Sequence, residues 1–146
     1  MKKALVLSLI VIGCFIGIIN WQFGQVNAKL AESKEVKKQL DNFILHMRVD
    51  ETEEGIQVLR SLQYMGEETV EIKHQAPLIS VSLSHENHDF TGSLITKKMN
   101  SGNIYPQEKL VFAAPEKGEC NLYVQARFMA DDEEILIEHV EKLIFK

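Results

Sequence analysis

The chain has 146 residues, of which 45% are hydrophobic and 25% are charged, a composition typical of one globular domain rather than a disordered protein. Its formal net charge is −5. Beyond residue 28 the balance is more acidic: 16 basic residues less Lys2 and Lys3 leave 14, against all 21 acidic residues. Because such a domain repels phosphate backbones, nucleic acid is excluded as a partner.

An uncharged apolar run follows Lys2 and Lys3, and no charged residue appears again before Lys29. Basic residues ahead of an apolar run stay on the cytoplasmic side of a membrane, so the rest of the chain is expected to be exported. Residues 1–28 are therefore predicted to be a signal peptide or membrane anchor. The remainder is predicted to be extracytoplasmic, either membrane-anchored or secreted.

Three forms of attachment fit this segment. A signal peptide would be cut between Ala28 and Lys29, after small residues. An uncleaved anchor would use residues 4–23, about 30 Å of helix, which spans a hydrocarbon core. In the third form Cys14 is lipidated, because the residues before it resemble the lipobox of bacterial lipoproteins.

Residues 29–42 are rich in charged residues and helix formers, and Leu30 and Leu40 give only a thin apolar stripe. The segment is predicted to be a polar helical stalk or linker that lifts the following domain off the membrane.

From Phe43 onward the apolar period changes to two, which is typical of strands with one buried face. Strands are expected near residues 43–49, 56–64, 70–74, 79–83, 93–97, 110–112, 120–128 and 135–145. Polar loops are expected at residues 84–89 and 99–106, and a bulge near His139, because Val140 breaks the alternation of the last strand. Seven or eight short strands of this kind predict that residues 43–146 form a mainly β, antiparallel β-sandwich.

Residues 118–128 alternate apolar and polar side chains and are followed by a charged turn and a terminal strand. This arrangement resembles the last two strands of immunoglobulin-like and fibronectin-type domains. The resemblance implies an immunoglobulin-like sandwich, without the cysteine pair and strand tryptophan of antibody domains. Residues 61–83 more loosely resemble small bacterial sandwich domains, some of them protease-inhibitor-like. Only Cys120 lies beyond residue 28, and export without disulfides fits a bacterial envelope protein.

The best chemical candidate is the loop at residues 85–89, where His85, His88 and Asp89 are of metal-ligand type. A flexible loop rarely fixes tetrahedral geometry, so a solvated turn is expected and no metal or cofactor is assigned. His74 is expected to be buried and hydrogen-bonded to backbone at a strand end. Cys120 is expected to be a small buried apolar residue; if exposed, it could link two copies by a disulfide.

No nucleophile elbow, phosphate-binding loop, dinucleotide fingerprint, EF-hand or paired-cysteine zinc pattern occurs in the sequence. We therefore expect a non-enzymatic extracytoplasmic β-sandwich that binds a protein or a cell-envelope component. Its expected contact surfaces are the loops at residues 85–89 and 99–106 and any uncovered sheet edge. An inhibitor of an exported protease is the alternative, and a metal-binding envelope protein using the 85–89 loop is the third.

Overall fold

Ten strands make up the regular structure of residues 28–146, the part of the chain that the computed structural model describes. They are β1 (Lys34–Leu40), β2 (Phe43–Thr52), β3 (Gly55–Tyr64), β4 (Val70–Gln75), β5 (Ile79–Leu83), β6 (Leu94–Met99), β7 (Ile104–Pro106), β8 (Leu110–Ala113), β9 (Gly118–Ala130) and β10 (Glu133–Phe145). No helix occurs among these residues.

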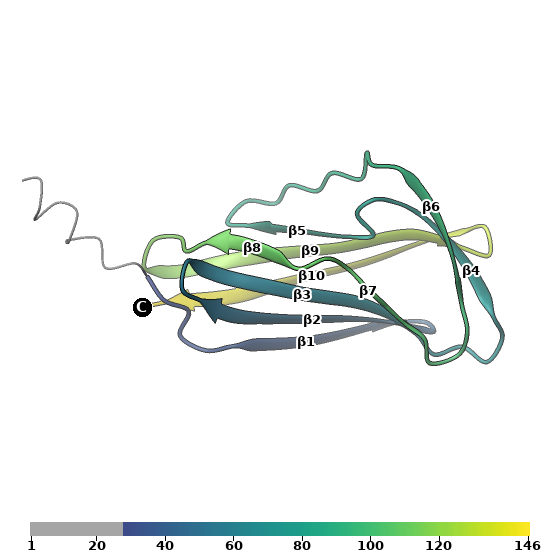
Figure 1. Cartoon of the computed structure of the whole chain (residues 1–146), viewed down its shortest axis with the longest axis horizontal. Helices are drawn as coiled ribbons and strands as arrows, with labels where there is room; N and C mark the ends of the chain where they lie inside the picture. Colours follow the sequence, from purple (N-terminus) through teal and green to yellow (C-terminus); the bar gives the residue numbers. More distant parts are fainter. Residues whose placement is uncertain (1–27) are drawn as a thin grey trace, which may run out of the picture.

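The strands form two five-stranded sheets that lie face to face (Figure 1). Sheet I has the order β1-β2-β3-β7, with β8 also paired to β3. Sheet II has the order β10-β9-β4-β6, with β5 also paired to β9. Every pairing is antiparallel. The predicted mainly β, antiparallel sandwich is therefore confirmed for this part of the chain.

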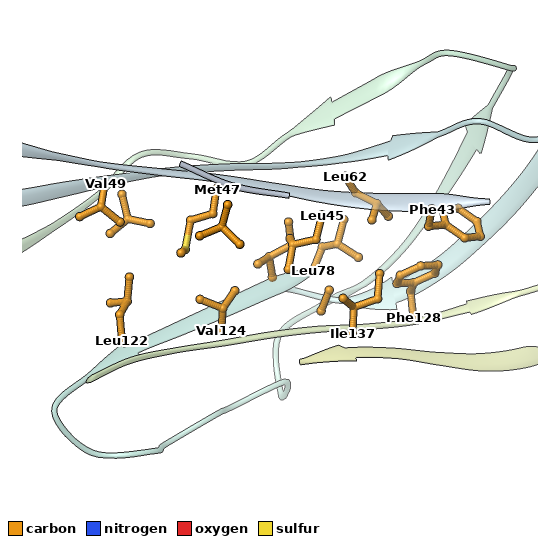
Figure 2. Close-up of a cluster of buried hydrophobic side chains, with 14 of the residues drawn as sticks. Phe43, Leu45, Met47, Val49, Leu62, Leu78, Leu122, Val124, Phe128 and Ile137 are labelled. Carbon is orange, nitrogen blue, oxygen red and sulfur yellow. The ribbon is translucent and has the colours of Figure 1, made fainter. Parts of the chain in front are cut away.

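The core lies between the sheets, where alternate side chains of each long strand point inward. Figure 2 shows side chains of β2 facing those of β9 and β10 across the interior. Phe43 joins the two layers, because its ring meets Phe128 edge-on with centroids 4.8 Å apart and also lies 5.1 Å from the ring of Tyr64. Edge-to-face contacts of this kind stabilise a core beyond the area that they bury.

The predicted helical stalk is wrong, because much of it is strand β1. This strand pairs with β2 without interruption, from Lys34 opposite Val49 to Leu40 opposite Phe43. Its lysines, glutamate and glutamine favour a helix by only a few tenths of a kcal/mol each. Pairing satisfies the free backbone edge of β2, and Val36 packs into the core. The sandwich therefore begins before residue 43.

Two smaller expectations also fail. The loop predicted at residues 99–106 contains the short strand β7 at its end. The bulge predicted near His139 does not exist, because β10 pairs with β9 in one unbroken register. Val140 is 52% exposed and lies on the outer face of sheet II, so the odd-numbered residues of β10 continue to point inward past it.

The first described residues lie at the same end of the sandwich as the C-terminus (Figure 1). Lys29 and Lys146 exchange two backbone hydrogen bonds, 2.8 and 2.9 Å long, and Leu30 forms a bridge with Phe145. Among residues 28–146, no helix has the length and apolar character needed to cross a membrane. The predicted signal peptide or anchor, with Cys14 and the span at residues 4–23, lies outside the described residues, and cleavage after Ala28 stays a prediction.

Candidate functional site

The outer face of sheet I carries three rows of side chains that cross its strands. The register places Glu35, Arg48 and Leu59 in the first row, Lys37, His46, Ser61 and Pro106 in the second, and Gln39, Ile44, Gln63 and Ile104 in the third. Because neighbours in such rows have Cβ atoms about 5 Å apart, each row acts as one contiguous surface.

A groove of about 480 Å³ lies over the first two rows and reaches Ile104 of the third; it is lined by β1, β2, β3 and β7. Leu59 and Ile104 contribute large apolar side chains that are 40% and 57% exposed, and Pro106 lies beside them. Pro106 lies between the rows of Leu59 and Ile104, so the three side chains form a discontinuous apolar strip across the solvent face of the sheet.

The groove exists because β3 changes partner along its length. β8 pairs with β3 only as far as Val58, and β7 pairs with it only from Ser61. Leu59 and Arg60 lie at the junction, where one backbone hydrogen bond, from Gln107 N to Arg60 O at 3.0 Å, holds the connecting segment. The incomplete ladder leaves the outer side of Leu59 uncovered.

The inner side of this junction is fixed by the Arg60 side chain, which is only 7% exposed. Its Nε donates to Ile79 O of sheet II at 2.7 Å, and its Nη1 donates to Glu108 O at 2.6 Å. Burial lowers the pKa of Arg60, and the charge of Glu108 partly opposes that effect. Arg60 therefore ties β3, the segment after β7 and sheet II together directly beneath the groove.

The two basic side chains exposed at the groove, Arg48 and Lys37, differ in whether they have an ion-pair partner. Arg48 is neutralised by Asp50 at 2.8 Å and by Glu35 at 3.6 Å. Lys37, by contrast, has no ion-pair partner among residues 28–146. In a domain with a large excess of acidic residues, the groove thus presents one unneutralised ammonium group on β1, two strands away from Leu59.

His46 adds a hydrogen-bonding group to the second row. Its Nε2 lies 2.8 Å from Gln63 Oε1. Because an amide oxygen only accepts, Nε2 carries the proton in this contact, and Nδ1 of the neutral ring is left as an acceptor. Together with the Ser61 hydroxyl and the Gln107 amide, the groove offers both donors and acceptors around an apolar centre.

The predicted metal candidates are not brought together. His88 Nδ1 lies 2.9 Å from Ser80 Oγ, and Asp89 Oδ1 accepts from Thr91 N at 3.0 Å, while His85 is exposed. Nowhere in the described part of the chain do three His, Cys, Asp or Glu side chains form a group that could hold a metal ion. The segment is largely exposed to solvent, and two hydrogen bonds, from His88 to Ser80 and from Asn87 N to Ser82 Oγ, hold it against the outer side of β5.

The other predicted residues lie on the inner side of the sandwich. His74 is buried as expected, with Nδ1 3.0 Å from Gln75 O and Nε2 3.2 Å from Tyr105 Oη. Cys120 faces the core but is only half-buried, and its Sγ lies 3.1 Å from Ser84 Oγ. Neither residue lines the groove.

The groove itself was not predicted from the sequence. One signal was present: Leu59 is a large apolar residue at an outward position of a strand whose other outward residues are polar. The segment at residues 99–106 was predicted to be a contact surface, and it supplies Ile104 and Pro106 to the groove.

Comparison with known proteins adds little to this description. No known protein family matches the chain, and no curated protein matches its sequence. Among solved structures, the chain is similar to the GAE domain of GGA2p from Saccharomyces cerevisiae. The two are 10% identical, with a TM-score of 0.44, over 76% of this chain and 96% of that domain.

Proposed function

We propose that this protein is a non-enzymatic, extracytoplasmic sandwich of immunoglobulin-like type that binds another protein through the groove on sheet I. The groove, with its exposed apolar residues and its unneutralised lysine, is the observation that supports this function. The extracytoplasmic location rests on the sequence of residues 1–28 alone.

The chemistry of the groove favours an extended segment of a partner polypeptide. Apolar side chains of the partner would pack against Leu59 at one end of the groove and against Ile104 at the other, which removes exposed apolar surface from water at about 25 cal/mol per Å². A carboxylate at the part of the segment that crosses β1 would pair with Lys37, and the backbone between would bond to His46 and Ser61. An acidic, apolar peptide fits this arrangement better than a basic one.

The position of the groove is compatible with attachment to a membrane. Residue 28 lies at one end of the sandwich, beside the C-terminus (Figure 1). The groove instead lies along the flank of sheet I, on residues in the middle of β1, β2 and β3. A tether at residue 28 would therefore leave the groove open to a partner.

The test is a selection of extended peptides from a random display library on the purified full-length chain. Selected peptides are expected to combine an apolar residue with a flanking Asp or Glu. Their affinity is expected to fall at least about tenfold for Leu59→Glu, because a charge then occupies the apolar centre. Lys37→Glu is expected to weaken acidic peptides and to strengthen their lysine-substituted versions.

Leu94→Glu is the matched control, because Leu94 is an even more exposed leucine but lies on β6 of sheet II. It is expected to leave peptide affinity unchanged. Selected peptides that bind Leu59→Glu and Lys37→Glu as tightly as they bind the unaltered chain would show that the groove is not the binding site.

A further inference from the structure

Strand β10 forms one edge of sheet II, and much of that edge is unpaired. Residues 29–31 cover its last part, where Ala31 N donates to Ile144 O and Lys146 N donates to Lys29 O, each at 2.8 Å. Within the described part of the chain, no other segment pairs with this edge between residues 134 and 142. A free edge of this length can accept another strand.

The direction of the free backbone groups follows from the two bonds just given. In an antiparallel strand, the N–H and C=O of one residue point to the same side, and the side alternates along the chain. Since Ile144 and Lys146 point away from β9, the other even-numbered residues of β10 do so too. Glu138, Val140 and Lys142 therefore present their backbone donors and acceptors to the open edge.

The sequence of β10 is self-complementary about Val140. Residues at equal distances on either side of Val140 match one another in kind: Glu138 with Lys142, His139 with Glu141, Leu136 with Ile144, Ile137 with Leu143, and Ile135 with Phe145. The first two pairs are polar with opposite or complementary charge, and the other three are apolar. In an antiparallel pair of two such strands, each residue of one strand therefore lies opposite a residue of matching kind in the other.

We infer that two copies of this chain associate by antiparallel pairing of their β10 edges about a two-fold axis at Val140. Val140 then lies opposite Val140 of the second copy, and each Glu138 lies opposite a Lys142. The ladder covers Glu138 to Lys142, because the segment at residues 29–31 blocks it beyond that point. Such a short ladder gives a reversible dimer rather than an obligate one.

Other registers and other edges fit less well. An axis at Glu138 would place two glutamates directly opposite each other, which destabilises the pair. On the edge of sheet I, β1 would bring Lys37 against Lys37. On β6, Lys97 and Lys98 are adjacent, and lysines of this kind oppose edge pairing.

Two inward-facing residues of β10, His139 and Glu141, make the pairing selective for a second copy of the chain. His139 Nε2 lies 2.8 Å from Glu141 Oε2 of the same chain, and both side chains are only about a quarter exposed. Inward-pointing charges on an edge strand disfavour most incoming strands. A second copy is the exception, because it places Glu141 opposite each His139.

The first test is disulfide cross-linking of the full-length chain, with Cys14→Ala and Cys120→Ser as the background. Val140→Cys is expected to cross-link to a dimer under mild oxidation, because Cα atoms of such a pair lie about 5.5 Å apart, within disulfide range. Leu136→Cys is the control, since it is similarly exposed. In the inferred register the two copies of residue 136 lie about 27 Å apart. Equal cross-linking of both variants, or none at residue 140, overturns the inference.

The second test is a charge exchange, followed by sedimentation equilibrium of the full-length chain in detergent. Glu138→Lys and Lys142→Glu are each expected to weaken the dimer at least about tenfold, because each creates two like-charge contacts. The double variant is expected to return to within about threefold of the original affinity, since the exposed Lys142–Glu119 pair that it also alters contributes little. A wholly monomeric original chain, or a double variant as weak as the single ones, contradicts the pairing.

Discussion

Substitution of Arg60 tests how the two sheets are held together. Its guanidinium is buried between them and forms no ion pair among residues 28–146; it bonds instead to the backbone carbonyl oxygens of Ile79 and Glu108. Arg60→Met keeps an unbranched apolar stem but removes the guanidinium and with it both donors. The substitution therefore measures the contribution of these two hydrogen bonds less the cost of burying the guanidinium.

The expected cost follows from two opposing effects. Hydrogen bonds from a charged donor contribute about 1.5–3 kcal/mol each, and both are lost. Part of this loss is offset, because folding of the methionine variant no longer removes a guanidinium from water. We expect the free energy of unfolding to fall by about 2–3 kcal/mol at pH 7, with an unchanged dependence on denaturant.

Urea unfolding of the full-length chain, followed by circular dichroism, measures this change. Arg127→Met is the matched control, because Arg127 is exposed and pairs only with Glu134 at 2.8 Å, so a loss below about 0.5 kcal/mol is expected. An Arg60→Met variant as stable as the original chain would refute the reasoning. It would mean that dehydrating the guanidinium costs as much as its two hydrogen bonds contribute.

Three further predictions concern single positions. Burial alone would raise the pKa of Asp50, but hydrogen bonds, chiefly from Arg48, hold this pKa below its usual value. Ionised Asp50 therefore stabilises the fold above about pH 4, and this stabilisation is lost as the pH falls through the lowered pKa. Asp50→Asn should therefore be less stable than the original chain in urea at pH 7 but equal to it near pH 2. Gly55→Ala should cost more than about 2 kcal/mol in the same assay, because its Cβ would overlap the Phe112 carbonyl oxygen. Leu45→Ala, at a fully buried position, should cost about 2–5 kcal/mol.

The elements that could be predicted from the sequence are those in which one strand carries its own signal. β4 alternates buried and exposed residues over its whole length and β2 and β9 do so over most of theirs, so a period of two was enough to find them. β1 has no such signal, because only Val36 is buried and its lysines favour a helix. Its strand conformation comes from pairing with β2, which a local pattern does not contain.

The groove could not be predicted for a related reason. Leu59, Ile104 and Lys37 lie far apart in the sequence, and only the registers of three strand pairs place them on the same face of sheet I. The rule that apolar residues point inward also caused a specific error. It required a bulge to explain Val140, whereas an apolar residue on the outer face of an edge strand needs no bulge.

The proposed groove on sheet I and the proposed pairing edge of β10 can act together. They share no residue, since the groove lies on sheet I and the pairing edge is β10 of sheet II. A dimer would therefore carry two open grooves, and a partner that is dense on a surface would be held by both, which strengthens retention without any new contact.

Glu138→Lys separates this effect from the binding itself. The variant should leave the affinity for a single peptide in solution unchanged, because Glu138 is not part of the groove. On a densely coated peptide surface it should dissociate at least about tenfold faster than the original chain, and on a sparse surface at the same rate. An equal loss in solution would mean that the substitution acts on the groove, and the two surfaces could then no longer be treated as independent.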